Sequence, residues 1–439
     1  GRERGGRGWA TVMTFTLLSW IIAVSLLAVQ IVEWIGDVLN LRALVPTPPA
    51  GFERVYDGDR YAKSQTYTRE RTRFGFVVSS VSLVTLFLFW FMGGFHVLDS
   101  WTRSWALPEI FRGLAYIGIL AMGKEFLSLP FSLYGTFVIE ERYGFNRTTA
   151  RTFIGDRLKG YGLTVLIGGP VLALVLWLFI RWGGGAWVWG WMAVAGISLL
   201  FQFIAPTWIL PLFNKFTPLE EGPLRQAIFD LARRVEFPLT NVFVMDGSKR
   251  SAKGNAFFTG FGKNKRIALF DTLIEKHTVT ELTAVLAHEI GHYKKGHIWK
   301  GFALRVVQTG VLFYLLSLTL GRSELFNAFG LEQISVPAGL VLFGILFSPV
   351  SFFISLPLHA FSRRNEYEAD RYAQETLGTG KDLASGLKGL SAAGLSNLTP
   401  HPFYVWLHAS HPPVVDRVAA LLKFSPPVKS PTVGIETLQ

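Results

Sequence analysis

Three histidines and a glutamate lie within ten residues of an apolar, helical stretch at 283–300. His288, Glu289 and His292 form the pattern HExxH, in which residues i and i+4 of a helix project about 40° apart. Both imidazoles can therefore reach one metal ion, and Glu289 would lie beside that ion, where it can take a proton from an attacking water. The pattern predicts a hydrolytic metal centre. By composition it would arise in roughly one such chain in a hundred, so a third ligand is needed.

A second polar segment offers that third ligand. A catalytic zinc ion takes three protein ligands and keeps one position open. The segment 362–375 supplies Glu366 and Asp370, again four residues apart on one helix face. Glu366 can complete a site of two histidines and one carboxylate, and Asp370 is placed to orient a ligand imidazole from behind. Glu368 points elsewhere and is expected to be a solvated charge. The alternative is two unrelated helical faces, one with surface histidines and one acidic.

The remaining histidines carry less weight. His297 follows His292 by five residues, about 140° further round a continuous helix, so it is expected either to be structural or to contact a ligand from outside the metal site. His359 is expected to be structural. His411 begins a helix with prolines in its first turn. It is either a simple helix-start residue or, together with Arg417, a cation that faces a developing oxyanion.

The composition indicates a membrane protein. Half of the 439 residues are hydrophobic and only 17% are charged, whereas a soluble chain averages about a quarter. The formal net charge of +12 comes without a basic stripe or a recognition motif, so no nucleic-acid partner is expected. The chain has no cysteine, which excludes disulfides, thiolate nucleophiles and cysteine-bound zinc. No signal peptide precedes the first apolar run, which is expected to stay in the mature protein.

Long apolar runs predict a mainly helical fold with seven membrane-spanning helices, because about 20 helical residues cross a hydrocarbon core. The predicted spans are 13–35, 74–97, 111–138, 163–182, 186–212, 303–320 and 336–361. Three glycines at 183–185 join the fourth and fifth spans in a tight hairpin. The sixth span is barely long enough, so a buried soluble helix is its alternative. Lys124 and Glu125 in the third span, and Gln202 in the fifth, indicate either a packing salt bridge or a polar cavity.

The basic loops predict the orientation. Seven crossings put the two termini on opposite sides, and the loops after the first and third spans are rich in arginine. The positive-inside rule therefore places these loops, the segment 214–301 and the C-terminal segment in the cytoplasm. Three arginines before the first span, Arg2, Arg4 and Arg7, argue against this orientation.

The chain divides into five predicted parts. These are a membrane region at 1–213, a catalytic segment at 214–302, two spans at 303–361, a second catalytic segment at 362–424 and a flexible tail at 425–439. In the first catalytic segment, we expect a helix at 224–235 and strands at 241–246, 255–261 and 266–271, with a turn at 262–265. A capping box from Thr278 to Glu281 starts the histidine helix. Together these elements predict a zincin-like α+β metalloprotease domain with a small sheet, attached to membrane helices.

Several motifs, in this order along the chain, resemble the type I CAAX prenyl protease family of seven-span membrane zinc endopeptidases. The resemblance covers nearly the whole chain and is carried by VIEERYGFNRTT, PLFNKFTPLEEGPL, VMDGSKRSAKGNAFFTGFGKNKRIALFDTLIE, AHEIGHYKKGH, SRRNEYEAD and SHPPVVDR. It implies seven helices standing as staves around a water-filled chamber that the catalytic domain closes at one end. The family often has a histidine near Lys253 or Gly254 and a tryptophan where Tyr293 stands. These departures bear on substrate preference.

The resemblance also implies a role for each site residue. The ligands of one zinc ion per chain would be His288, His292 and Glu366. Glu289 would be the general base and acid. Asn255 and Ala256 would lie on an edge strand that pairs with the substrate backbone. His411 and Arg417 would help to hold the substrate or to stabilise its transition state.

The predicted function is hydrolysis of peptide bonds in a membrane, with removal of the last three residues of a prenylated CaaX protein or peptide. The nearest alternative is a quality-control zinc protease for damaged membrane proteins, although such relatives are usually shorter and have fewer spans. A transporter or scaffold with a structural metal site is a third interpretation. It would need a fourth ligand, and none is evident near the histidine helix.

The expected partners are the peptide or protein substrate and membrane lipid. The sequence leaves the oligomeric state open, a monomer included. The expected location is the inner or plasma membrane of a prokaryote, or the endoplasmic reticulum membrane of a eukaryote, with the catalytic domain on the cytoplasmic side.

Overall fold

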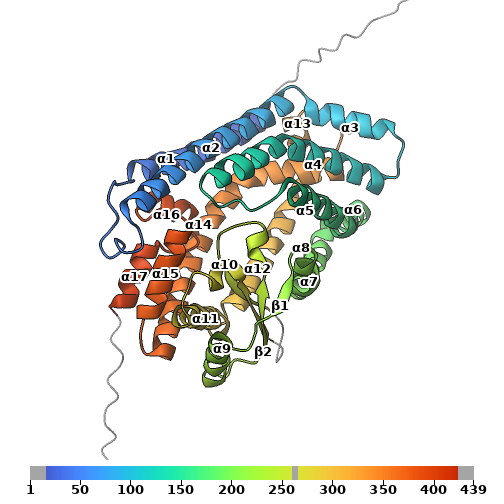
Figure 1. Cartoon of the computed structure of the whole chain (residues 1–439). Coiled ribbons are helices and arrows are strands. Elements are labelled where there is room, and N and C mark those ends of the chain that lie inside the picture. The colour runs from blue at the N-terminus through green and yellow to red at the C-terminus, as the bar shows by residue number, and fades with distance from the viewer. Residues whose placement is uncertain (1–15, 260–264, 424–439) are drawn as a thin grey trace, which may run out of the picture.

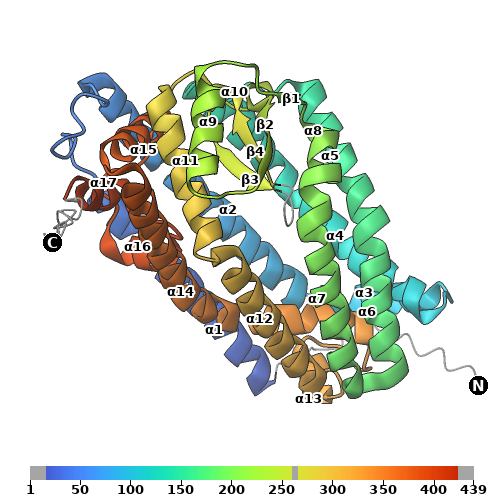
Figure 2. The same ribbon diagram turned by 90° about the horizontal axis from the view of Figure 1, so that it is seen from below.

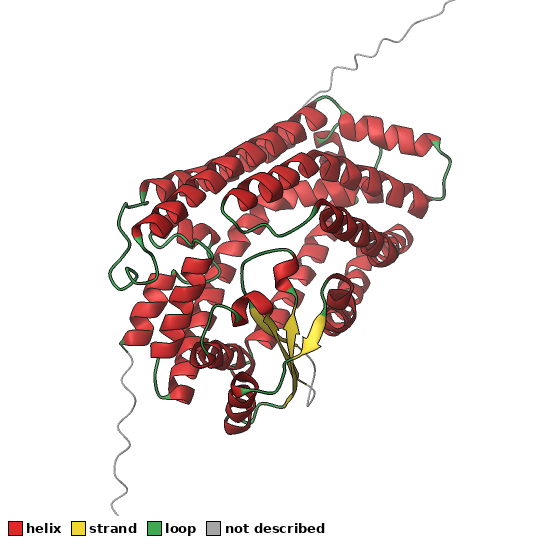
Figure 3. Cartoon of the chain, in the orientation of Figure 1, coloured by secondary structure: helices red, strands yellow, loops and turns green. Residues whose placement is uncertain are grey.

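The computed structural model describes residues 16–259 and 265–423, most of which are helical, with one small sheet (Figures 1 and 3). Figure 2 shows the sheet together with α9 (Pro223–Arg234) and α10 (Asp271–Ile274) at one end of the molecule. The long helices run from there towards the opposite end, where α13 (Ser323–Ala328) lies. The N-terminal arginines, the start of the first predicted span, most of the predicted turn at 262–265 and the tail at 425–439 lie outside the described residues.

Six helical stretches in the described residues are long and apolar enough to cross a membrane. They are α1 (Leu17–Arg42), α2 (Gly58–Phe91), Glu109–Glu140, Ala150–Phe213, α12 (His297–Thr319) and α14 (Val336–Leu377). Glu109–Glu140 comprises α4 (Glu109–Tyr134) and the π-helical turn η1 (Gly135–Glu140). The prediction of seven spans differs from this number only because the predicted fourth and fifth spans share one stretch.

That stretch, Ala150–Phe213, turns back on itself at η3 (Gly183–Ala186), where Gly183 has a φ of +55°. Before the turn lie α5 (Ala150–Leu163), η2 (Thr164–Gly168) and α6 (Gly169–Trp182); after it lie α7 (Trp187–Ile204), η4 (Ala205–Ile209) and α8 (Leu210–Phe213). A positive φ without a Cβ penalty is available to glycine. The predicted glycine hairpin between two spans is therefore confirmed.

One predicted span end is wrong. The second span does not continue to residue 97, because Gly93, with a φ of +79°, ends α2 and starts α3 (Gly94–Ser104). Such a left-handed residue at a helix end is a common stop signal. The helix of the seventh predicted span continues beyond residue 361, because α14 runs without interruption for 42 residues. One helix therefore carries both the last span and the acidic residues of the predicted site.

The sheet has four strands in the order β1-β2-β4-β3. They are β1 (Phe216–Pro218), β2 (Leu239–Met245), β3 (Ala256–Thr259) and β4 (Lys265–Phe270). β2 and β4 are parallel, whereas β3 pairs antiparallel with β4 and sets Ala256 opposite Leu269. Three strands were predicted; β1 was not, since three residues are too few to show an alternation. β3 is an edge strand, and its outer edge is the feature that matters for the site.

Three clusters of buried hydrophobic residues hold the described part of the chain together. One packs the sheet and α9 against α11 (Val279–Lys294), α15 (Lys381–Ala393) and α17 (Val414–Leu422), with Leu231, Leu269 and Leu286 almost fully buried. A second joins the spans around Trp90 and Phe329, and a small third cluster includes Tyr67 and Phe145. Many apolar side chains on the spans stay exposed, as expected of helices that face lipid. The short helix α16 (Pro402–His408) packs on α1 and α14.

The polar residues inside the spans fall into two classes. Glu125 on α4 pairs with Arg157 on α5 and accepts a hydrogen bond of 2.8 Å from Tyr161, which is the packing arrangement. Gln202 instead lines a cavity of about 680 Å³ between α7, α12 and α14, together with Arg305. The span region thus contains both a partly buried salt bridge and a polar cavity.

Candidate metal centre

Helix α11 places two histidines directly against α14. The predicted capping box is confirmed: the Thr278 side chain accepts from the Glu281 amide, and the Glu281 carboxylate accepts from the Thr278 amide at 2.9 Å. Further along, a Cβ added at Gly291 would come within 3.1 Å of the backbone oxygen of Ala369 on α14. The glycine inside the HExxH pattern therefore lets the two helices approach closely enough for their side chains to meet.

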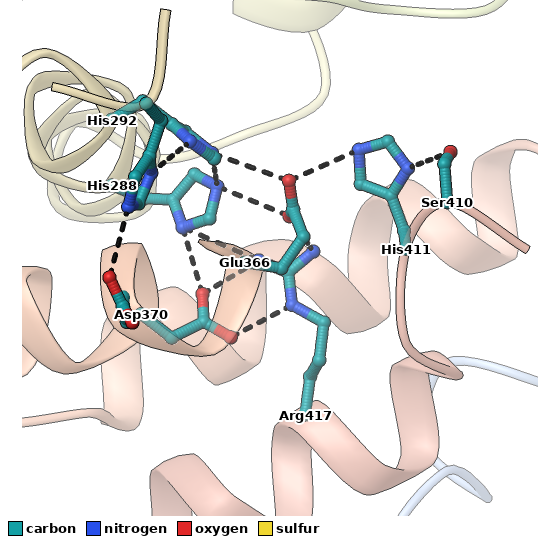
Figure 4. Close-up of polar contacts among 9 residues, drawn as sticks. His288, His292, Glu366, Asp370, Ser410, His411 and Arg417 are labelled. Atoms are coloured by element: carbon teal, nitrogen blue, oxygen red, sulfur yellow. Dashed lines mark hydrogen bonds and ion pairs between the residues drawn. The ribbon is translucent and has the colours of Figure 1, made fainter. Parts of the chain in front are cut away.

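The three predicted metal ligands converge from these two helices (Figure 4). His288 Nε2 lies 3.1 Å from His292 Nε2 and 3.5 Å from a carboxylate oxygen of Glu366. His292 Nε2 lies 3.3 Å from the other Glu366 oxygen. His288 and Glu366 are buried, and His292 is half-buried. The group is one that could hold a metal ion.

These separations fit a tetrahedral metal site. Zinc binds histidine nitrogen and carboxylate oxygen at about 2.0–2.2 Å, so two ligand atoms at tetrahedral corners are about 3.3–3.5 Å apart. The 3.1 Å between the two rings, and the 3.5 and 3.3 Å from the rings to the two different Glu366 oxygens, lie close to that range, and one atom from each residue lies within 4.8 Å of the others. Two ring nitrogens that face each other across 3.1 Å, beside a carboxylate, also favour a cation between them. The donor set and its spacing therefore fit the predicted metal.

Behind His288 lies a buried carboxylate. Asp370 Oδ1 is 2.8 Å from His288 Nδ1, so the ring presents Nε2 to the metal position. Arg417 donates two hydrogen bonds of 2.6 and 2.8 Å to Asp370, and its guanidinium lies 3.1 Å from a carboxylate oxygen of Glu366. Burial lowers the pKa of His288, but its hydrogen bonds to Asp370 and Glu366 outweigh this and raise the pKa to about 9. The surroundings of this ring therefore favour a positive charge.

Behind His292 lies a second support, in one of the two roles expected of His297. His292 Nδ1 is 2.9 Å from His297 Nδ1, and His297 Nε2 is 3.2 Å from Glu368. The expectation that Glu368 is only a solvated charge is wrong. The 140° estimate for His297 assumed one continuous helix, but Gly296, with a φ of +68°, separates α11 from α12 and turns His297 back towards His292. A glycine just before the histidine was the signal that could have shown this.

Comparisons with known proteins agree with this geometry. Residues 37–215 match the model of the N-terminal domain of CAAX prenyl proteases, described as five membrane helices, and residues 218–425 match the model of peptidase family M48. A CAAX prenyl protease 1 homolog from Oryza sativa subsp. japonica is 37% identical over 413 residues, covering 90% of this chain and 95% of its own. The chain belongs to the type I CAAX prenyl protease family.

Two further relatives support this assignment. The CAAX prenyl protease 1 homolog of Homo sapiens is 34% identical over 422 residues, which cover 85% of this chain and 88% of the human protein. The crystal structure of S. mikatae Ste24p superposes with a TM-score of 0.88 at 32% identity and covers 93% of this chain and 100% of that one. This member of the CAAX prenyl protease family is therefore a multi-pass membrane metalloprotease.

The ligand cluster of this CAAX protease family member opens into a cavity of about 320 Å³. Its lining includes polar residues, among them Glu289 and His411, and a set of apolar side chains. The apolar lining consists of Leu273, Val285, Leu383, Leu387 and Leu390. Burial raises the pKa of Glu289, which makes its carboxylate a stronger base than an exposed glutamate. The cavity therefore combines a basic carboxylate with a surface for an aliphatic side chain.

His411 and Arg417 both line this cavity, but in different environments. The His411 side chain is 64% exposed, and its Nε2 lies 3.3 Å from Glu366, with Ser410 hydrogen-bonded to its other nitrogen at 3.0 Å. Arg417 is buried and engaged by two carboxylates. Helix α17 begins only at Val414, so the prolines precede the helix and do not form its first turn. His359 contacts a backbone carbonyl of α16, as expected of a structural residue.

The predicted substrate strand lies at the mouth of the same cavity. Ala256 begins β3, Asn255 comes directly before it, and both line the cavity with the ligands. The Asn255 carbonyl accepts from the Phe270 amide at 3.0 Å on the β4 side, and the outer edge of β3 pairs with no other strand of the sheet. Of the two family departures, Tyr293 packs its ring against Phe237 outside the cavity lining. Lys253 stands two residues before Asn255.

Proposed function

We propose that this chain is a zinc endopeptidase that removes the C-terminal tripeptide of prenylated CaaX proteins. The observation that carries the proposal is the ligand cluster, in which two ring nitrogens and a carboxylate lie 3.1 to 3.5 Å apart at the wall of a cavity. The names of the relatives, CAAX prenyl protease 1 homologs, support the substrate class.

Zinc is the metal that we assign to the cluster, with one ion per chain. The ligands would be His288, His292 and Glu366. Two imidazoles and one carboxylate form a common catalytic zinc set. When bound, the ion supplies a Lewis acid that polarises the scissile carbonyl. Asp370 and His297 would hold the two imidazoles in the orientation that the ion needs.

The proton transfers fall to Glu289. Its carboxylate lines the cavity beside the ligands, and its raised pKa suits a group that must first take a proton from water and then give it up. The acceptor of that proton is the leaving nitrogen of the cleaved peptide bond. Because Glu289 carries the proton in both directions, no second acid is needed.

His411 would stabilise the charge that develops on the carbonyl oxygen. Its imidazole is exposed at the cavity and can donate a hydrogen bond to that oxygen. Arg417 serves a different purpose, because two carboxylates already occupy its guanidinium. It would keep Glu366 and Asp370 in place.

The substrate backbone would extend the sheet. Asn255 and Ala256 offer the outer edge of β3 to an extended peptide, the mode in which main-chain hydrogen bonds hold the peptide and side-chain pockets select it. The leucines in the cavity lining favour a substrate with an aliphatic residue next to the scissile bond, as in a CaaX sequence. Membrane lipid surrounds the spans, where the substrate's prenyl chain would also partition.

The membrane side and compartment remain part of the proposal. The arginine-rich loops support a catalytic end in the cytoplasm. The relatives reported above come from eukaryotes, which supports the endoplasmic reticulum membrane as the compartment if the source is a eukaryote. The five-part division of the chain stays a prediction, and the oligomeric state stays open.

Glu289→Gln tests the proposal. The amide cannot take a proton, so hydrolysis of a prenylated CaaX peptide should fall to background, while metal analysis still finds one zinc ion per chain. The matched control is Glu275→Gln, which neutralises an exposed glutamate on the nearby turn after α10 and should keep full activity. Peptide hydrolysis that survives Glu289→Gln would contradict the assignment of the base.

A pair of peptides tests the substrate class. A prenylated CaaX peptide and its unprenylated twin should differ in kcat/KM, with release of the tripeptide only from the CaaX end. Equal cleavage of both peptides, or faster cleavage of unfolded membrane proteins, would instead favour a quality-control protease.

A further inference from the structure

The segment 250–253, which leads into the substrate strand β3, is fixed on both sides by hydrogen bonds. On the membrane side, its backbone pairs with the loop after η1: Ala252 donates to Phe145 at 3.0 Å, and Arg250 accepts from Arg147 at 3.1 Å. An isolated antiparallel bridge joins Asn146 and Ser251. The segment is thus paired, strand-like, with a loop that belongs to the membrane helices.

On the opposite side, α10 and the residues after it hold the same backbone. The Thr272 hydroxyl donates to the Lys253 carbonyl at 3.0 Å, and the Lys276 ammonium donates to the Ala252 carbonyl at 2.6 Å. The segment therefore lies between the membrane region and the catalytic core, with hydrogen bonds to each.

Arg250 anchors the start of the segment. Its guanidinium makes two parallel bonds of 2.7 and 2.9 Å to Asp156 on α5. It also donates to the Asn214 side chain at 2.8 Å and to the Phe213 carbonyl at 2.7 Å, both at the end of α8. A bidentate arginine–carboxylate pair fixes direction as well as distance.

Lys253 anchors the end of the segment to two other membrane helices. Its ammonium lies 3.0 Å from Glu140 of η1 and 3.0 Å from the Tyr67 hydroxyl on α2. It also lies 4.2 Å from the centre of the Phe145 ring. Glu140 is mostly buried and accepts further hydrogen bonds from Tyr67 and Arg71. A half-exposed lysine that meets a carboxylate, a hydroxyl and an aromatic face is held in one place.

The connection from Lys253 to the substrate strand is short and has little conformational freedom. Asn255 follows after two residues, a reach of about 7 Å in an extended chain. Between them, Gly254 packs so closely that an added Cβ would come within 3.0 Å of Leu273. A shift of the Lys253 backbone would therefore be passed on to Asn255 and Ala256.

We propose that Lys253 is a positioning residue, which ties the outer edge of β3 to α2 and η1 so that the membrane helices set the alignment of the substrate backbone. This inference rests on the proposed function, in which that edge pairs with the peptide. Lys253 does not line the cavity, so it acts through the strand.

The first test is Lys253→Met, with Lys249→Met as the control because Lys249 is exposed in the same loop. Misplacing reacting groups by about 1 Å can cost about a hundredfold in rate. Accordingly, kcat/KM for the prenylated CaaX peptide should fall about tenfold to a hundredfold in Lys253→Met and stay unchanged in Lys249→Met. Lys253→Arg keeps the charge and should recover part of the loss. Zinc content should stay at the level of the unmodified protein, and unchanged kcat/KM would overturn the proposal.

The second test separates strand alignment from general damage. Peptides are N-methylated at each backbone amide in turn, which removes one donor for pairing with β3. N-methylation of the amide that pairs with β3 should lower kcat/KM of the unmodified protein by a much larger factor than it lowers kcat/KM of Lys253→Met, because that variant has already lost the alignment. The proposal fails if kcat/KM of Lys253→Met is lower than that of the unmodified protein by the same factor for every peptide, methylated or not.

The third test needs no hydrolysis. The chain has no cysteine, so spin labels can be attached to Arg73→Cys on α2 and to Asn255→Cys directly before β3. Electron paramagnetic resonance then measures the distribution of distances between the two labels. Adding Lys253→Met should broaden or shift this distribution, whereas Lys249→Met should not. An unchanged distribution overturns the proposal. If the unmodified protein cleaves no CaaX peptide, only the proposed function fails, and the distance measurement still decides the tether.

Discussion

The two sides of the cavity are built differently. On the metal side, polar side chains are mostly buried and have protein partners: Asp370 supports His288, His297 supports His292, and Arg417 spans two carboxylates. On the substrate side, the His411 side chain is 64% exposed and Asn255 is also exposed. The side chains of the metal side are held by protein partners, whereas a bound peptide would supply partners to the substrate side.

The difference follows from the elements that carry each side. Helices α11 and α14 fix their side chains by local spacing, and Gly291 against Ala369 fixes how close the two helices come. The substrate side consists of an edge strand and the chain before α17, whose positions depend on contacts far away in the sequence. Rigid helices suit a metal that tolerates little change in ligand distance. An open strand edge suits a peptide that supplies the missing hydrogen bonds.

The largest effect that we predict is on the metal side. Glu366→Gln replaces a charged ligand by a neutral amide and leaves Arg417 with one carboxylate fewer. Zinc content should fall, and activity should fall to background, well beyond the roughly 10- to 100-fold that removal of an outer partner costs. Metal analysis and peptide cleavage, measured on the same preparation, check this.

The matched control for Glu366→Gln is Glu375→Gln, an exposed glutamate on the same helix. It should keep both zinc and activity. If Glu366→Gln retained a full complement of zinc, Glu366 would not be a zinc ligand. The distinction between a metal side and a substrate side would then break down.

A smaller effect, of a different kind, is predicted on the substrate side. His411→Ala removes a hydrogen-bond donor from the cavity, and loss of one such donor costs about a hundredfold to a thousandfold in kcat. Zinc content should not change, since the side chain lies outside the ligand set. His401→Ala, which removes only the cap of α16, serves as the control. If His411→Ala lost its zinc, His411 would belong to the metal side and not to the substrate side.

The metal side could be largely predicted from the sequence, because the i, i+4 spacing of His288 with His292 and of Glu366 with Asp370 is a local property of a helix. The structure brings these four residues together, although their chemical roles stay proposals. The family resemblance supplied Asn255 and Ala256, which no local spacing indicates. Composition likewise gave the membrane class, while the ends of α2 and α14 did not follow from hydropathy.

What could not be predicted depends on three-dimensional contacts. The sequence left a supporting role for His297 open, but its contact with His292 requires the break at Gly296, because a straight helix would have turned the two rings apart. The tether of Lys253 to Glu140 joins residues 113 positions apart. Single positions with long-range partners carry no periodic signal. The substrate side is therefore the part of the molecule that a sequence describes least well.

The smallest predicted effect lies at the start of the metal side, in the cap of α11. Glu281 accepts from the Thr278 amide at 2.9 Å and from Ser385 on α15 at 2.6 Å. Burial raises the pKa of Glu281, but these hydrogen bonds outweigh it and leave the pKa below 4.5. A carboxyl whose pKa is lower in the folded state stabilises the fold above its unfolded pKa, and this contribution disappears as the pH falls through the folded value.

Glu281→Ala should therefore lower the free energy of unfolding by about 1 kcal/mol or less near pH 7, the usual cost of a lost cap. The difference from the unmodified protein should shrink as the pH falls below 4.5. Glu281→Gln, which can still accept both hydrogen bonds, should lose less and show a weaker dependence on pH. Thermal unfolding in detergent from pH 7 to pH 3.5 measures both variants. If Glu281→Ala instead released zinc, the metal side would depend on its helix start as strongly as on its ligands, and the rigidity attributed to α11 would come from its cap and not from its packing on α14.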